Sequence, residues 1–141
     1  MTKIKVMTIV GTRPEIIKLS QVIKELDSYE KGHWWVQDLS SMLPIYLSPE
    51  IKSKKVLDMC ASPGGKSFQT ICLNNKVTLN DISLERIKKL RVNLDRLNFS
   101  NEIKNYNALD IPEKEKFDVI ILDSPCSGVG TLRRNPDILF K

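Results

Sequence analysis

The chain has 141 residues, of which 41% are hydrophobic and 28% are charged, and its formal net charge is +5. This composition is ordinary for a soluble globular protein, and the length suits one domain with its own core. No apolar run approaches the about 20 residues that span a bilayer, and the N-terminus lacks a small-residue cleavage site. We therefore expect neither a membrane segment nor a signal peptide. The basic excess permits a polyanionic partner, although it more often serves solubility.

The sequence has three cysteines, and no two of them have C-x-x-C spacing. An odd number without that spacing argues against both a disulfide framework and a structural zinc site. We therefore expect a protein that holds no metal, in the reduced environment of the cytoplasm.

A strand and a helix are predicted at the N-terminus. Residues 3–10 alternate and then become continuously apolar, and Thr12 and Glu15 have the spacing of a capping box. A helical apolar stripe follows, formed by Ile16, Leu19, Val22, Ile23 and Leu26. We take residues 1–30 as a separate βα unit.

This first unit, with its Gly-Thr-Arg-Pro-Glu sequence at residues 11–15, resembles the N-terminal strand and helix of non-hydrolysing UDP-N-acetylglucosamine 2-epimerases. The likeness covers about residues 3–29, and the second domain and catalytic acids of those epimerases have no counterpart in the sequence. We expect a structural strand and helix here, and no epimerase reaction.

Residues 38–47 predict a short helix that Asp38 caps and Pro44 kinks or ends. Its expected apolar side consists of Leu39, Met42, Leu43, Tyr46 and Leu47.

The central prediction is a strand, a glycine turn and a helix start between residues 56 and 73. Val56, Leu57 and Met59 form a short buried strand, Pro63-Gly64-Gly65 breaks it, and a helical pattern begins at Lys66. This is the first βα unit of a doubly wound sheet, in which ligands bind beyond the carboxyl ends of the strands. The sequence has neither G-x-x-x-x-G-K-[ST] nor G-x-G-x-x-G, so a P-loop and a dinucleotide fingerprint are excluded.

A second strand, residues 77–81, ends in Asp81. An acid at this place, about 20 residues past the turn, suits ribose hydroxyls. Without a pyrophosphate loop, it suggests a nucleoside ligand such as S-adenosylmethionine. Up to this point, any α/β domain with a glycine turn fits equally well.

Ser83 is expected to cap a helix with a buried stripe made by Leu84, Ile87, Leu90, Leu94 and Leu97. Its other faces carry Arg86, Lys88, Lys89, Arg91 and Arg96, which could touch phosphates, although a solvated outer face is favoured. Residues 103–108 predict a third strand, and residues 117–122 predict a buried fourth.

Five segments occur in a fixed order: Gly32-His33-Trp34-Trp35-Val36-Gln37-Asp38, Asp58 to Lys66, Asn80-Asp81-Ile82-Ser83, Asp123-Ser124-Pro125-Cys126-Ser127-Gly128, and Arg133-Arg134-Asn135-Pro136-Asp137-Ile138. From about residue 32 to residue 141, this series is similar to the Sun (Fmu) family of RNA cytosine-5 methyltransferases. The resemblance implies a Rossmann-like, doubly wound α/β domain at residues 31–141, dependent on S-adenosylmethionine. Of the family's seven strands only the first four are encoded, in spatial order 3-2-1-4, so the domain is incomplete and lacks its C-terminal strands.

The resemblance also implies the cofactor-binding residues, namely Cys60, Ala61, Ser62, Pro63, Gly64, Gly65, Lys66, Asp81, Asn107 and Asp123. Ser62 stands where alanine is usual. Asn107 stands where the family has an acid that holds adenine, and its carbonyl could still accept from adenine's amine. Asp110 is a less favoured substitute.

The catalytic residues implied are Asp123 and Cys126. Asp123 is expected to hold the methionine end of the cofactor or the exocyclic amine of the target base. The cysteine matching Cys126 assists product release in the family, and the attacking thiolate comes from a later Thr-Cys-Ser motif. That motif is absent from these 141 residues. We therefore expect a truncated family member, weak or inactive alone, that acts on RNA, with rRNA favoured.

Two alternatives remain open: a non-catalytic cofactor- or RNA-binding half that docks to a separately encoded C-terminal half, and a decayed gene product. The fourth strand is expected to have an unpaired apolar edge, which residues 3–10 could cover. Trp34 and Trp35 could stack bases, although packing against the sheet is favoured. His33 is expected to be exposed and without a catalytic role.

Overall fold

The computed structural model describes residues 25–112 and 114–124. The predicted N-terminal strand and its pairing with the fourth strand lie outside these residues. So do Cys126 and the segment of residues 133–138.

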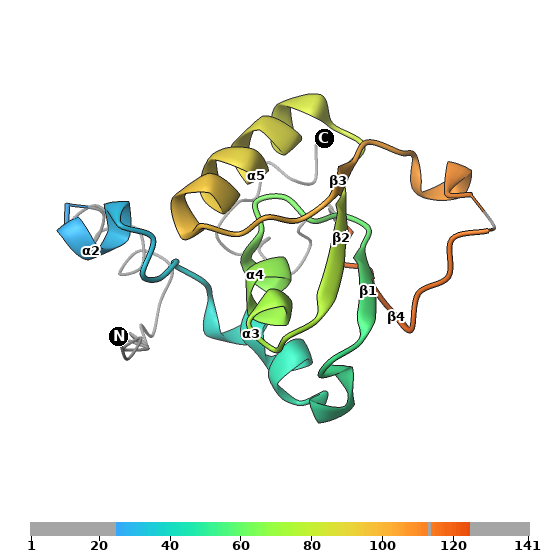
Figure 1. The fold of residues 1–141 in the computed structure, drawn as a ribbon, viewed down its shortest axis with the longest axis horizontal. Helices are drawn as coiled ribbons and strands as arrows, with labels where there is room; N and C mark the ends of the chain where they lie inside the picture. Colours follow the sequence, from blue (N-terminus) through green and yellow to red (C-terminus); the bar gives the residue numbers. More distant parts are fainter. Residues whose placement is uncertain (1–24, 113, 125–141) are drawn as a thin grey trace, which may run out of the picture.

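The described residues form a parallel sheet in the order β3-β2-β1-β4 (Figure 1). Its strands are β1 (Lys55–Asp58), β2 (Lys76–Asn80), β3 (Ile103–Lys104) and β4 (Val119–Ile121). The order reverses direction between β1 and β4, which is the switch point where doubly wound sheets bind ligands. The predicted α/β fold and the order 3-2-1-4 are confirmed.

Two crossover helices follow the central strands, as the sequence predicts. Helix α4 (Gly65–Ile71) follows β1, and helix α5 (Leu84–Leu97) follows β2. Ser83 caps α5, because its Oγ accepts a hydrogen bond from the backbone N–H of Arg86 at 3.3 Å. Buried leucines at positions 90, 94 and 97 join Phe68 of α4 and the apolar side chains of one sheet face in a single core.

The register decides which strand residues face that core. Val56 of β1 is paired with Val77 of β2 and with Val119 of β4. All three belong to the core or pack against it. Since side chains alternate along a strand, Asp58 lies on the same face as Val56.

The N-terminal part of the described chain has two helices. Helix α2 (Asp27–Glu30) lies beside the C-terminal end of α5, while α3 (Leu39–Tyr46) contacts α4 (Figure 1). Helix α3 lies within the predicted range of residues 38–47, with Asp38 at its N-cap position, and Pro44 lies inside it without ending it. The predicted apolar side was wrong, because Ile45 is the buried residue of α3. Four of the five expected residues are exposed: Leu39, Leu43, Tyr46 and Leu47.

Two strand predictions need correction. The third strand ends at Lys104 instead of residue 108, and a 3-10 helix (Ala108–Asp110) follows it. The fourth strand is not buried on both faces: Val119 and Ile121 pack against the core, whereas Ile120 is 57% exposed. A continuous apolar run does not reveal that only one of its faces is covered.

No helix in the described part of the chain is long and apolar enough to cross a bilayer.

Candidate functional site

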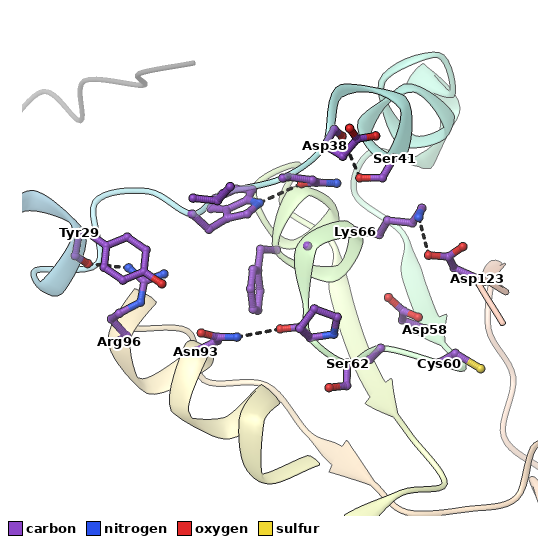
Figure 2. Close-up of a pocket in the computed structure, with 17 residues that line it drawn as sticks. Tyr29, Asp38, Ser41, Asp58, Cys60, Ser62, Lys66, Asn93, Arg96 and Asp123 are labelled. Atoms are coloured by element: carbon purple, nitrogen blue, oxygen red, sulfur yellow. Dashed lines mark hydrogen bonds and ion pairs between the residues drawn. The ribbon is translucent and has the colours of Figure 1, made fainter. Parts of the chain in front are cut away.

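A cavity of about 510 Å³ opens at the carboxyl end of β1 (Figure 2). Seven residues predicted for the site line it: Cys60, Ala61, Ser62, Pro63, Gly65, Lys66 and Asp123. Gly64, Asp81 and Asn107 are not among the lining residues. The structure therefore brings the loop of residues 60–66 and Asp123, which follows β4, together at the cavity. The other three predicted residues do not line it.

The turn into α4 depends on Gly64. Its φ is +117°, which L side chains rarely adopt, and a Cβ there would overlap the ring of Phe68. The Gly64 carbonyl accepts the first hydrogen bond of α4, from the Phe68 N–H at 2.8 Å. Trp35 packs edge-on against the same ring, with 5.7 Å between the centroids. Trp35 thus packs against the core, which includes residues of the sheet, and its ring partner there is Phe68 of α4.

Asp58 is the residue that the sequence prediction missed. It lines the cavity and is only 2% exposed. Its Oδ2 accepts a hydrogen bond of 2.6 Å from the Ser67 hydroxyl, whereas its Oδ1 is buried without a partner. Burial raises the pKa of Asp58 from 3.8 to about 6, against the lowering effect of the Ser67 hydrogen bond. The signal in the sequence is a charged residue within an apolar strand that leads into a glycine turn.

Lys66 and Asp123 form an ion pair at the mouth of the cavity. Lys66 comes from the first turn of α4 and Asp123 from the segment after β4, so the pair spans the two strands of the switch point. The Lys66 side chain is 16% exposed and that of Asp123 is 60% exposed. A ligand that enters the cavity here meets the positive charge of Lys66 and the negative charge of Asp123 side by side.

Cys60 lies on the loop beside this pair. Burial and the nearby carboxylates of Asp81 and Asp58 raise the pKa of the Cys60 thiol. A raised pKa keeps the thiol protonated, which is the opposite of what a nucleophile needs.

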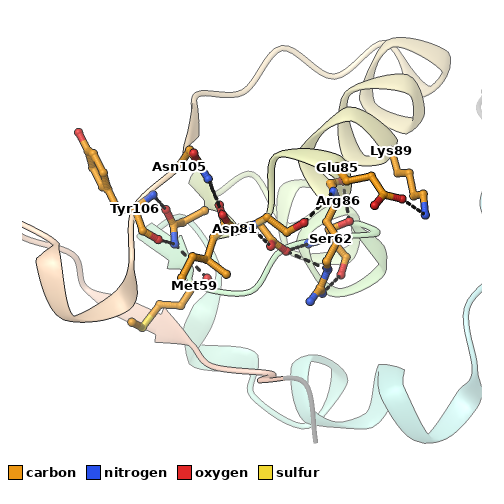
Figure 3. Close-up of polar contacts among 11 residues, drawn as sticks. Met59, Ser62, Asp81, Glu85, Arg86, Lys89, Asn105 and Tyr106 are labelled. Atoms are coloured by element: carbon orange, nitrogen blue, oxygen red, sulfur yellow. Dashed lines mark hydrogen bonds and ion pairs between the residues drawn. The ribbon is translucent and has the colours of Figure 1, made fainter.

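Asp81 follows β2 and contacts the loop of residues 60–66, and it is only 1% exposed (Figure 3). Its Oδ1 accepts a hydrogen bond from the Ser83 N–H at 3.0 Å. Its Oδ2 accepts one from the Ser62 N–H at 3.3 Å and lies 3.3 Å from the Arg86 Nε. The carboxylate is held by the protein itself, so ribose binding by Asp81 stays a prediction.

Asn107 is exposed and caps the 3-10 helix after β3, accepting a hydrogen bond from the Leu109 N–H at 3.1 Å. Its predicted contact with adenine stays a prediction. Asn105, two residues earlier, donates hydrogen bonds to the carbonyls of Asp81 and Ile82 at 2.7 and 2.9 Å. This asparagine therefore ties the end of β2 to the segment after β3.

The sequence favours a solvated outer face for Arg86 and Arg96 of α5, and this prediction is wrong. The Arg86 Nη2 donates to the Ser62 carbonyl at 2.7 Å. The Arg96 Nη1 donates to the carbonyls of Tyr29 and Trp34, and its guanidinium stacks 3.7 Å from the centre of the Tyr29 ring. Both side chains are partly buried because they hold the backbone of other segments.

Among the described residues, no group of three or more His, Cys, Asp or Glu side chains is placed to hold a metal ion. Cys60 and Cys72 form no disulfide within the described chain. His33 is exposed.

A parallel sheet in this order, with a glycine turn after β1 and a cavity at the switch point, is the arrangement of a Rossmann-like α/β domain. The family model "16S rRNA methyltransferase RsmB/F" matches residues 44–141. The chain belongs to this family.

Relatives with assigned names agree. The chain is 40% identical over 118 residues to ribosomal RNA small subunit methyltransferase B of Photorhabdus laumondii subsp. laumondii, covering 80% of this chain and 28% of the relative. It is 36% identical over 115 residues to the human 28S rRNA (cytosine(4447)-C(5))-methyltransferase, covering 78% of this chain and 14% of that enzyme. The chain thus spans less than a third of these relatives.

Solved structures support the same fold. NSun6 from Pyrococcus horikoshii, solved with SFG, has a TM-score of 0.66 and 33% identity, covering 74% of this chain and 28% of that one. A methyltransferase homologue from the same organism has a TM-score of 0.67 and 33% identity, with coverage of 84% and 41%. The N-terminal likeness to epimerases finds no counterpart among these matches, and it stays a prediction.

Proposed function

We propose that this chain binds S-adenosylmethionine and contributes that site to methylation of carbon 5 of cytosine in RNA, with rRNA as the substrate class. The observation that carries the proposal is the loop of residues 60–66, which lines the cavity at the end of β1 together with Asp123. Family membership supports it, as does the relative solved with SFG, an analogue of S-adenosylmethionine.

The residues around the cavity fit such a cofactor. The cavity of about 510 Å³ lies within the range of about 300–1,000 Å³ that small-molecule sites occupy. The unpartnered Oδ1 of Asp58 is a buried acceptor that suits the ammonium of the cofactor's methionine end. The free N–H groups at the start of α4 suit its carboxylate. When bound, the cofactor supplies an electrophilic methyl group.

Lys66 and Asp123 then lie where a target base meets the cofactor site. The Asp123 carboxylate accepts from an amine, either that of the methionine end or the exocyclic amine of cytosine, and the ion pair with Lys66 orients it. Cytosine must leave its stack to reach this place, so single-stranded RNA is the preferred form. We assign product release to Cys126.

Methylation at carbon 5 requires a thiolate that adds to carbon 6 and raises the electron density at carbon 5. The 141 residues contain no Thr-Cys-Ser sequence, and we assign the attacking thiolate to none of their cysteines. Its source is part of the proposal: either a longer form of this chain or a separately encoded C-terminal half. Without it, we expect cofactor binding with little or no turnover. The expected cytoplasmic setting suits this chemistry, because thiols stay reduced there.

Calorimetric titration of the purified chain with S-adenosylmethionine tests the proposal. We expect saturable one-to-one binding. Asp58→Asn removes the buried charge while keeping the shape of the side chain, and it should weaken binding of S-adenosylmethionine. Adenosine has no ammonium group, and its affinity should not change. A folded wild-type chain that binds no S-adenosylmethionine at millimolar concentration contradicts the proposal.

A further inference from the structure

One side of α5 carries a row of hydrogen-bond donors that all end on main-chain carbonyls outside the helix. Arg86 donates to the Ser62 carbonyl at 2.7 Å, and Asn93, two helical turns later, donates to the Pro63 carbonyl at 3.0 Å. Arg96 continues the row by holding the carbonyl of Tyr29 (Figure 2) and that of Trp34. The first two contacts are made to consecutive residues of the loop that precedes α4.

We propose that Arg86 and Asn93 are positioning residues for this loop, and that they set its affinity for S-adenosylmethionine by fixing the peptide planes before Gly64. This inference rests on the proposed function. The Pro63 carbonyl and the Gly64 N–H belong to one planar unit and point in opposite directions. A hydrogen bond from Asn93 to that carbonyl therefore fixes the direction of the Gly64 N–H.

Arg86 ties the other side of the same turn. Its guanidinium bridges the Ser62 carbonyl and the Oδ2 of Asp81 (Figure 3). In return, the Ser62 hydroxyl donates to the Arg86 carbonyl at 2.9 Å. Serine at this position, where the resemblance leads one to expect alanine, thus adds a reciprocal bond between loop and helix.

Gly64 explains why such support matters. A glycine at a φ of +117° has no side chain to hold its conformation, and glycine has the largest backbone freedom to lose. Ordering the loop in advance lowers the entropy lost when a ligand binds. Arg86 does this from outside the cavity lining, whereas Asn93 donates to the Pro63 carbonyl and also lines the cavity.

The test compares substitutions at the two positions by cofactor titration of the full chain and by hydrogen exchange measured without cofactor. Asn93→Ala removes one neutral hydrogen bond and should raise the KD for S-adenosylmethionine about fivefold. Arg86→Gln removes charge-assisted contacts and should raise it about tenfold. Arg86→Lys keeps the charge but not the two-pronged geometry, and its KD should be intermediate. Arg91→Gln, an exposed arginine on the same helix, is the matched control and should leave the KD unchanged.

Hydrogen exchange separates positioning from a general loss of stability. In Asn93→Ala, faster exchange should be confined to residues 60–68, with β2 and α5 protected as in the wild type. Exchange that is unchanged in the loop, or faster to the same degree in β2, overturns the inference. A wild-type chain that binds no cofactor contradicts the proposed function instead, and the exchange pattern still decides whether α5 orders the loop.

Discussion

The Ser67 hydroxyl donates a 2.6 Å hydrogen bond to Oδ2 of Asp58, and this contact joins the first turn of α4 to the last residue of β1. Both side chains are buried, Ser67 completely. The contact leaves Oδ1 of Asp58 without a partner on the cavity side. Burial of this carboxylate raises its pKa and makes the site sensitive to pH.

Stability should fall as the pH rises through the range in which Asp58 ionises. Burial raises its folded-state pKa from 3.8 to about 6, so between these values the folded chain binds more protons than the unfolded chain. The contribution of Asp58 to the free energy of unfolding is most favourable below pH 3.8. It declines between pH 3.8 and about pH 6 and is lost above that pH, and the total loss is at most roughly 3 kcal/mol. Asp58→Asn should abolish this dependence and stabilise the chain at pH 7. Urea denaturation at pH 4, 5, 6 and 7 measures it.

Asp95→Asn is the control for that series. Asp95 is exposed on α5, and its replacement should leave the pH dependence of the wild type intact. If the Asp58→Asn chain is less stable than the wild type at pH 7, the Asp58 carboxylate is not the cause of the fall in stability with rising pH.

Gly64→Ala should destabilise the chain by about 1–3 kcal/mol, because alanine is strained at a φ of +117° and its Cβ overlaps the Phe68 ring. Gly65→Ala is the matched control. Its φ is not in the left-handed region, and the nearest atom to its Cβ is Cδ of the Gln37 side chain at 3.3 Å, a much milder contact. Thermal unfolding of the two variants should show a much larger loss for residue 64. Equal losses would show that the backbone conformation is not the constraint.

Lys66→Gln should change the free energy of unfolding by less than about 1 kcal/mol, since its partner Asp123 is 60% exposed and exposed ion pairs stabilise little. Its effect should fall on ligand binding. Asp123→Asn then separates the two proposed roles of that carboxylate. Weaker binding of S-adenosylmethionine indicates contact with the methionine end. Unchanged cofactor binding with weaker binding of cytidine, measured on the cofactor-loaded chain, indicates contact with the base.

Phe68→Ala should cost about 3–5 kcal/mol, which is the range for deleting a buried aromatic ring. Phe68 is 2% exposed and its ring contacts those of Trp35 and Phe99. Tyr46→Ala is the control, because Tyr46 is 75% exposed and should cost little. Chemical denaturation gives both values. A small loss at residue 68 would mean that the aromatic cluster does not support the loop.

Local sequence determined the elements around the site. Alternation and apolar runs placed β1 and β2, the Pro63-Gly64-Gly65 break placed the turn, and Ser83 marked the start of α5. Each of these signals acts within a few residues along the chain, through backbone conformation, capping or side-chain periodicity. The five ordered motifs indicated the family, and the family implied the strand order. Periodicity alone does not specify that order.

Only the tertiary structure decided which polar groups are buried and what they hold. Asp58 becomes a half-satisfied acid because α4 folds over the end of β1. Arg86 and Asn93 become supports of the loop because α5 lies beside it, with partners 24 and 30 residues away in the chain. Ile120 stays exposed because one face of β4 lacks a cover in the described chain. Desolvation and hydrogen bonding depend on neighbours in space, and a pattern along one chain does not contain those neighbours.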